Sequence, residues 1–256
     1  MTPAIQAISL EKHFGRERVL GGIDLEVPRG CLYGFVGPNG AGKTTTLSLL
    51  TGVLLPTTGS VKLLGEPMTA ESASLRRRIG VVPDGFFLWE RLRVDELLRL
   101  HGVIYGMHAP DLGGRVEELI DLLDLADHRH KLIATYSHGL KKRVSFAAAV
   151  LHAPDVLFLD EPFEGMDPLS VRVIAANLEA MVAQGVTVFL TSHQLDIVQR
   201  LCTRVAVIAG GEIAWEGATE SLATRMSSGA SGALERLFFE LAGSPRTKEV
   251  LTWLQR

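Results

Sequence analysis

Cysteine is scarce in this sequence, and the chain also lacks long apolar runs, a basic start and an excess of positive charge. Its 256 residues include two cysteines, Cys31 and Cys202, whose spacing is not that of metal ligands. We therefore expect neither a cysteine-ligated metal nor a disulfide framework. The two residues are predicted to be reduced and structural, as in a cytosolic protein.

The other absences concern membranes and nucleic acids. No apolar run approaches the ~18 residues that a membrane span needs. The first residues, MTPAIQAISLEKHFG, lack the basic and then apolar pattern of a signal peptide. We therefore expect any action at a membrane to depend on a partner. The net charge of −3 differs from the basic footprint of nucleic-acid-binding proteins, so no nucleic-acid partner is expected.

The sequence does contain enough apolar material for a full core. Hydrophobic residues make up 46% and charged residues 21%, which is an ordinary globular balance. Residues 227–232 are serine and glycine with one alanine, the composition of a flexible hinge. We therefore expect one domain over residues 1–226 and a C-terminal helical tail over residues 227–256. In that tail, a helical stripe of Leu234, Leu237, Phe238 and Leu241 is predicted to pack on the body of the protein, and a last helix is expected over residues 247–254.

The most informative stretch is residues 37–45, GPNGAGKTT, which we call the phosphate loop. It follows the apolar run LYGFV and precedes a helical pattern, so a strand, a glycine-rich loop and a helix N-terminus meet. Glycines let backbone N–H groups converge on phosphate oxygens beside the positive end of the helix. Lys43 is placed to reach the β- and γ-phosphates and the Thr44 hydroxyl to coordinate Mg²⁺. The loop predicts a nucleoside-triphosphate site.

Short alternating strands flank this loop on both sides. Ile23, Leu25 and Val27 are predicted to face a core, and residues 60–64 form a second strand-like piece between turn signals. Both belong to a small antiparallel sheet beside the nucleotide. Phe14 and Val19 are predicted to lie in the first connection of that sheet, either as core residues or as a platform for a purine ring.

Two further apolar runs end in polar side chains. Residues 156–159 suit a strand buried on both faces, and Asp160 and Glu161 follow at its carboxyl end, where α/β sheets bind ligands. Asp160 fits a Mg²⁺-holding role and Glu161 fits a general base toward water; the alternative is a solvated acidic pair. His193 follows a second such run, where it is either structural or within reach of the γ-phosphate.

Two helical regions complete the pattern. Residues 94–127 predict two helices, and Ser137 is a plausible N-cap for another helix, either as a cap alone or as part of an anion site. Between them, Phe86, Phe87 and Trp89 crowd into a predicted loop. Such a cluster either belongs to the core or marks a partner surface.

Taken together, these motifs resemble the nucleotide-binding subunit of ABC transporters. The similarity covers residues 5–215 in the expected order and is carried by GPNGAGKTT, YSHGLKKR, VLFLDEP, GMDP and the pair Ser192-His193. The motif YSHGL…KR and the tail ALERLFFELAG look most like single-domain ATPases of bacterial drug, antibiotic and polysaccharide exporters. The resemblance implies a RecA-like α/β phosphate-loop core with an antiparallel β-subdomain and an inserted helical subdomain near residues 85–150.

The same resemblance implies ATP and Mg²⁺ as ligands and assigns roles to residues. The residues expected to bind nucleotide are Phe14, Val19, Asn39, Gly40, Ala41, Gly42, Lys43, Thr44, Thr45, Ser137, Gly139 and Asp167. Thr44, Asp84 and Asp160 are expected at the metal, and Glu161 and His193 are the expected catalytic residues. Ser137 and Gly139 would contact ATP held by a second, head-to-tail subunit, and Asp167 would link the two sites.

The resemblance also implies a transmembrane partner, contacted by residues 84–93, and a peripheral place on the cytoplasmic side of the cell membrane. Asp84 stands where the family usually has glutamine; its carboxylate is shorter and adds negative charge beside the phosphates. Tyr136, His138 and Leu140 replace the commonest residues of the signature motif. We therefore expect an ATPase that powers transport, with export favoured by resemblance. The alternative is a soluble ABC ATPase of an assembly system.

Overall fold

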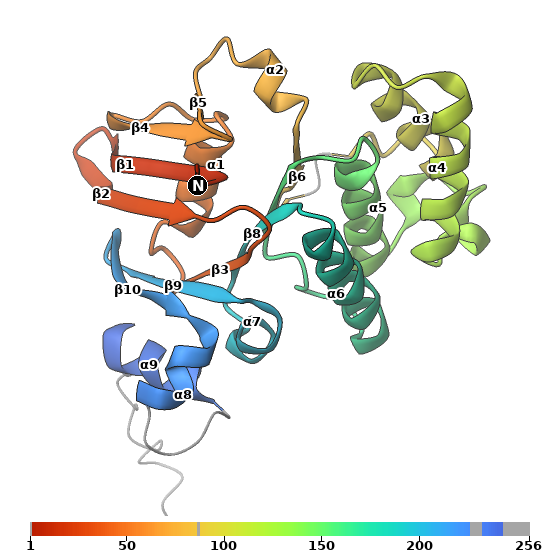
Figure 1. Cartoon of the computed structure of the whole chain (residues 1–256). Helices are drawn as coiled ribbons and strands as arrows, with labels where there is room; N and C mark the ends of the chain where they lie inside the picture. The colour runs from red at the N-terminus through yellow and green to blue at the C-terminus, as the bar shows by residue number, and fades with distance from the viewer. Residues whose placement is uncertain (1, 86–87, 226–231, 243–256) are drawn as a thin grey trace, which may run out of the picture.

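The computed structural model describes residues 2–85, 88–225 and 232–242. Two sheets form the frame of the molecule (Figure 1). A six-stranded sheet has the order β10-β9-β3-β8-β7-β6, and a four-stranded sheet has the order β2-β1-β4-β5. The predicted hinge and the predicted last helix fall mostly on residues 226–231 and 243–256, outside the described residues.

The six-stranded sheet is the parallel core. Its strands are β3 (Leu32–Val36), β6 (Ile79–Val82), β7 (Val156–Asp160), β8 (Thr187–Ser192), β9 (Arg204–Ala209) and β10 (Glu212–Ala218). All pairs are parallel except the β9–β10 hairpin. Every residue of β3, β7 and β8 is buried, as the continuous apolar runs predict for strands covered on both faces.

The four-stranded sheet is antiparallel, as predicted. It contains β1 (Ile5–Phe14), β2 (Glu17–Val27), β4 (Thr58–Leu63) and β5 (Glu66–Pro67). Ile23, Leu25 and Val27 are all buried. The predicted place of Phe14 and Val19 in a connection was wrong: they lie on β1 and β2, because the strands pair as far as Phe14 and Glu17. The alternating residues Ile23, Leu25 and Val27 lie in the second half of β2, whereas this pairing lies at its start.

Helix α1 (Lys43–Leu50) lies between the two sheets and joins them through one apolar core (Figure 1). Side chains alternate along β3, so Tyr33 and Phe35 enter this core, whereas Leu32 and Val36 enter a second core on the other face. The phosphate loop thus begins on a strand packed on both sides and ends on a helix packed on both sides.

Helices cover the second face of the core sheet. The helices against the sheet are α5 (His138–Val150), α6 (Pro168–Ala183) and α7 (Leu195–Leu201), and α3 (Val94–Ile104) and α4 (Ala109–Leu122) pack beyond α5. The two helices predicted within residues 94–127 are α3 and α4, and Val116 and Ile120 form the buried stripe of α4. Shorter pieces are α2 (Ala73–Arg76) and the 3-10 turns η1 (Ala126–His128) and η2 (Ile133–Thr135). Figure 1 shows α3 and α4 projecting beyond the sheet, with α5 between them and the core.

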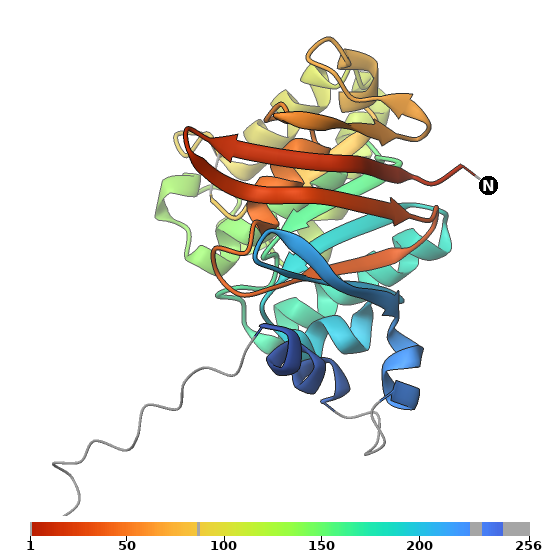
Figure 2. The same ribbon diagram turned by 90° about the vertical axis from the view of Figure 1, so that its left-hand side faces the viewer.

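The end of the described chain packs on the body of the protein. Helix α8 (Thr219–Arg225) follows β10, and α9 (Ala233–Ala242) lies against α7 and β9 (Figure 2). Leu234 and Leu237 of the predicted stripe are buried there. None of the helices in the described ranges combines the length and the apolar character that crossing a bilayer requires.

Candidate functional site

The phosphate loop runs from the end of β3 to the start of α1. Gly42 is the N-cap of α1 in the left-handed conformation, with φ of 105° and no side-chain cap. A Cβ there would lie 2.5 Å from the Leu20 side chain, so glycine is needed for both conformation and space. The first N–H groups of α1 therefore remain available to an anion.

Lys43 is held by the loop itself. Its Nζ donates to the carbonyl of Gly37 at 2.9 Å and to that of Pro38 at 3.4 Å. The same atom lies 3.7 Å from Oε1 of Glu161. The side chain is nearly buried, and its charge is therefore fixed at the loop in advance of any ligand.

Asp160 lies behind the loop at the end of β7. The Thr191 hydroxyl donates to its Oδ1. Burial raises the pKa of Asp160, while hydrogen bonds from Thr191 and Thr44 act in the opposite direction. Burial thus penalises the ionised form of this carboxylate, which makes a nearby cation favourable.

Glu161 follows in an uncommon conformation. Its φ is 46°, and its N–H donates to the carbonyl of Thr191 at 3.2 Å and to the hydroxyl of Thr191 at 3.3 Å. Left-handed backbone at a residue other than glycine is uncommon and often marks a functional position. Only 8% of Glu161 is exposed, so the carboxylate is directed into the protein rather than solvated.

His193 approaches Glu161 from the end of β8. Its Nδ1 lies 2.9 Å from Oε2 of Glu161, and its backbone N–H donates to the same oxygen at 3.2 Å. Since Oε1 faces Lys43, the two carboxylate oxygens have different partners. The sheet therefore brings the predicted catalytic residues together with the lysine of the phosphate loop.

A cavity of about 660 Å³ lies over these groups. The predicted residues that line it are Val19, Asn39, Gly40, Gly42, Lys43, Thr44, Thr45, Asp84, Glu161 and His193. Glu17 and Glu164 line it as well, and neither was predicted. Glu17 reaches the cavity because β2 pairs with β1 as far as Phe14, and neither Glu17 nor Glu164 carries a sequence signal of its own.

Six predicted residues lie outside this cavity wall. Ala41 and Asp160 are buried behind it. Phe14 is 48% exposed, with the Lys12 ammonium 5.2 Å from its ring centre. Ser137, Gly139 and Asp167 belong to a separate face, built by the starts of α5 and α6.

That second face is built by two helix N-termini. Ser137 caps α5, and its Oγ accepts from the N–H of Leu140 at 3.3 Å, which confirms the predicted cap. Asp167 caps α6 and accepts from the N–H groups of Leu169 and Ser170. Hydrogen bonds from Ser170 and then the Arg143 guanidinium hold the pKa of Asp167 well below its usual range.

Asp84 has a partner that its sequence position did not reveal. Its Oδ1 lies 3.6 Å from Nζ of Lys142 on α5. Nothing in the run Lys141-Lys142-Arg143 distinguishes the middle residue, because only the packing of α5 decides which lysine turns inward.

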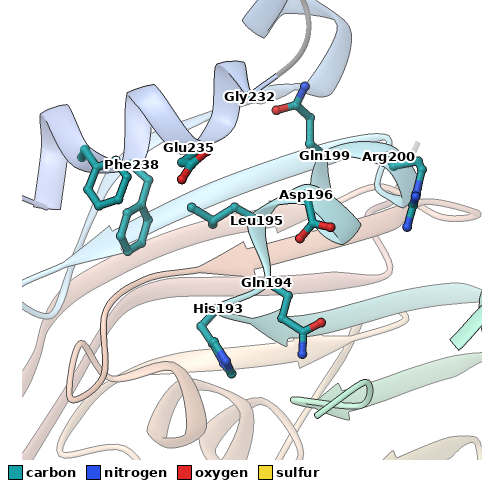
Figure 3. A pocket seen from close by; sticks show the side chains of 10 residues that line it. His193, Gln194, Leu195, Asp196, Gln199, Arg200, Gly232, Glu235 and Phe238 are labelled. Carbon is teal, nitrogen blue, oxygen red and sulfur yellow. The ribbon is translucent and has the colours of Figure 1, made fainter. Parts of the chain in front are cut away.

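A second hollow, of about 620 Å³, begins on the other side of His193, between α7 and α9 (Figure 3). In Figure 3, Leu195 and Phe238 face this hollow, while Asp196 and Arg200 line it from α7. It shares His193 with the first cavity but contains no part of the phosphate loop.

The oxygen donors in and directly behind the first cavity fit a magnesium nucleotide. Thr44, Asp84 and Asp160 offer hard oxygen donors, which Mg²⁺ prefers, and Mg²⁺ usually takes only one or two carboxylates together with substrate phosphates. In the described parts of the chain, no group of three or more histidine, cysteine or acidic residues forms a closed metal cage. An anion-ready loop, a fixed lysine and carboxylates at strand ends define a nucleoside-triphosphate-binding protein.

Comparison with known proteins narrows this class. The family model described as "ABC transporter" matches residues 20–164. The chain is 39% identical over 227 residues to the daunorubicin/doxorubicin resistance ATP-binding protein DrrA of Streptomyces peucetius, covering 89% of this chain and 69% of that protein. It is 37% identical over 214 residues to the Nod factor export ATP-binding protein I of Burkholderia lata, covering 84% and 70%.

A solved structure, described as the ATP-binding subunit of an ABC transporter, superposes with a TM-score of 0.85 at 26% identity. The match covers 93% of this chain and 99% of that one. The chain therefore belongs to the ABC transporter family, as an ATP-binding subunit that hydrolyses ATP. The predicted fold, a RecA-like phosphate-loop core with an antiparallel β-subdomain and an inserted helical subdomain, is confirmed.

Proposed function

We propose that this chain powers the export of a substrate through a separate transmembrane subunit, by binding and hydrolysing Mg²⁺-ATP at the cavity over the phosphate loop. One observation carries the proposal: Lys43, Glu161 and His193 converge in that cavity from α1, β7 and β8. The relatives named for drug resistance and for Nod factor export support the direction of transport.

The catalytic roles follow from the partners of Glu161. Lys43 would bind the terminal phosphates, and Glu161 would accept a proton from the attacking water. His193 holds the other carboxylate oxygen and is exposed enough to face the γ-phosphate. Mg²⁺, held by Thr44 and Asp160 with Asp84 nearby, would neutralise charge on the phosphates.

The adenine would lie at the edge of the β-subdomain. Phe14 and Val19 occupy neighbouring strands there, and the half-exposed ring of Phe14 would stack on the base. Within the phosphate loop, Ala41 is buried behind the cavity wall and Thr45 lines the cavity.

The site is proposed to be completed by a second subunit. Ser137 and Gly139 present an N-capped helix start on a face separate from the phosphate loop. A helix N-terminus favours an anion, and because this one does not line the cavity over the phosphate loop of its own chain, it suits ATP bound by another copy. In a head-to-tail dimer, Asp167 would lie at the junction between the two sites, and ATP would favour the closed state because it contacts both chains only there.

The transmembrane partner is proposed to contact residues 84–93, which would place the chain at the cytoplasmic face of the cell membrane. Trp89 is half exposed there and lies edge-on to His101 of α3, with ring centres 6.0 Å apart. Leu100, Val103 and Ile104 of α3 are exposed nearby in the chain. Phe86 and Phe87 lie outside the described residues.

A pull-down from detergent-solubilised membranes tests this function. We expect a multi-span membrane protein to co-purify with the wild-type chain and to be lost with Trp89→Ala. Phe239→Ala, an exposed aromatic on α9, is the matched control and should retain the partner. Capture of soluble proteins alone would contradict transport and favour the assembly-type ATPase.

A further inference from the structure

Lys142 is a buried lysine that no role described above uses. It lies on α5, five residues after Ser137, and only 1% of it is exposed. Its Nζ donates to the carbonyl of Asp84 at 3.1 Å and to the carbonyl of Glu161 at 3.2 Å, and lies 3.6 Å from Oδ1 of Asp84. A buried ammonium is costly unless such oxygens surround it.

The oxygens around Lys142 come from two loops that both reach the nucleotide cavity. Asp84 follows β6, and Glu161 follows β7, which is the neighbouring strand of the sheet. Asp84 and Glu161 both line that cavity. Lys142 therefore connects the ends of two strands with the helix whose start forms the second face.

The acidic residues around the cavity explain why an ammonium beside Asp84 matters. Asp84, Glu161, Glu17 and Glu164 all line the space proposed for a polyphosphate. Each carboxylate there opposes the binding of a phosphate anion through charge repulsion. An ammonium beside Asp84 offsets one of these negative charges, and Lys142 supplies it from outside the cavity wall.

The backbone contact has a second consequence. Glu161 lies at φ of 46°, a conformation that its surroundings must hold. Its N–H donates to Thr191 and its carbonyl accepts from Lys142, so the backbone N–H and the backbone carbonyl of Glu161 each have a hydrogen-bond partner. The orientation of the carboxylate toward Lys43 and His193 depends on that backbone.

We propose that Lys142 is a positioning residue for ATP hydrolysis, which compensates the charge of Asp84 and fixes the turn that carries Glu161. The proposal rests on the proposed place of both carboxylates beside the nucleotide. The neighbouring Lys141 cannot replace it, because the Nζ of Lys141 lies 2.5 Å from Oε1 of Glu90 and is therefore directed away from Asp84. Asp84 can thus stand where glutamine is usual without adding uncompensated charge.

The test uses Lys142→Met, Asp84→Gln and the double variant, with the exposed Lys131→Met as the control for loss of a lysine. The affinity of a fluorescent ATP analogue is measured in EDTA and in Mg²⁺, alongside kcat and KM. We expect Lys142→Met to weaken binding about fivefold in EDTA, less in Mg²⁺, and to lower kcat about tenfold. Adding Asp84→Gln should restore affinity to within about twofold but leave kcat low.

Unchanged affinity in Lys142→Met, or no recovery on adding Asp84→Gln, would overturn the charge compensation. An unchanged kcat would overturn the positioning of Glu161. If Lys142→Met does not fold, the test uses the double variant Lys142→Met/Asp84→Gln, in which neither charge of the pair is left unpaired. Failure of this double variant to fold would also contradict the proposal. Lys43→Ala is measured in parallel: if it still binds ATP, the proposed nucleotide site fails independently of Lys142.

Discussion

At the scale of single residues, the distinctive feature is how differently the two oxygens of Glu161 are engaged. Oε1 faces the Lys43 ammonium and Oε2 faces the His193 ring. Under the proposed function, a carboxylate held between a lysine and an imidazole would receive a proton from water near the γ-phosphate. The left-handed backbone at this residue is consistent with a position selected for its side-chain direction.

The variant Glu161→Gln tests this role. The amide keeps the size of the side chain but cannot accept the proton, so we expect ATP binding to persist and kcat to fall by at least about 10². Steady-state ATPase measurements and nucleotide titration check the two parts separately. Near wild-type turnover would remove Glu161 as the general base.

Asp84 is a carboxylate at a position where glutamine is usual in the family. As a carboxylate it can still face Mg²⁺, and its backbone carbonyl and side chain both contact Lys142. The negative charge that Asp84 adds at this position is therefore paired with the Lys142 ammonium. Only packing places a lysine of α5 beside this residue.

At the scale of elements, the starts of α5 and α6 form one junction. A Cβ on Gly165 would lie 2.6 Å from Nδ1 of His138, and one on Gly139 would lie 3.5 Å from the carbonyl of Gly165. Arg143 adds hydrogen bonds from α5 to Asp167 and Ser170 of α6. The two helix starts proposed to contact a second subunit are thus held as one unit within this chain.

Gly165→Ala tests that junction, with Gly185→Ala as its matched control. Both glycines have positive φ, 70° and 93°, but no atom lies within 4 Å of a Cβ on Gly185. Both variants should lose about 1–2 kcal/mol of stability from backbone strain. We expect only Gly165→Ala to lower ATPase activity, because only it displaces His138. Thermal unfolding and ATPase assays compare the two, and equal activities would argue against a functional junction.

At the scale of the whole molecule, the two faces of the site lie apart. The phosphate loop, Glu161 and His193 share a cavity that Ser137, Gly139 and Asp167 do not line. Under the proposed two-subunit arrangement, a single chain would offer two incomplete halves rather than one closed site. Association of two copies, with ATP between them, would bring complementary halves together.

ATP-dependent association is the corresponding prediction. In the Glu161→Gln variant, slow turnover should let the ATP-bound dimer accumulate, so that light scattering reports about twice the monomer mass when ATP is added. The variant Glu161→Gln combined with Lys43→Ala is the control and should remain monomeric. A monomer at saturating ATP in the first variant would count against the two-subunit site.

The order of motifs determined much of this protein on its own. The spacing in residues 37–45 requires a strand, a loop and a helix, and the apolar runs before Glu161 and His193 require buried parallel strands whose ends meet at one edge. Local chemistry of this kind also predicted the cap at Ser137, because capping depends on neighbours in the chain.

Tertiary structure alone decided the contacts between distant segments. The burial of Lys142 rather than Lys141, the entry of Glu17 and Glu164 into the cavity, and the pairing of β1 with β2 as far as Phe14 all depend on how elements pack. A side chain on α5 can reach Asp84 and Glu161 only because the sheet sets β6 beside β7. Sequence specifies which groups a site contains, whereas packing in three dimensions decides which of them touch.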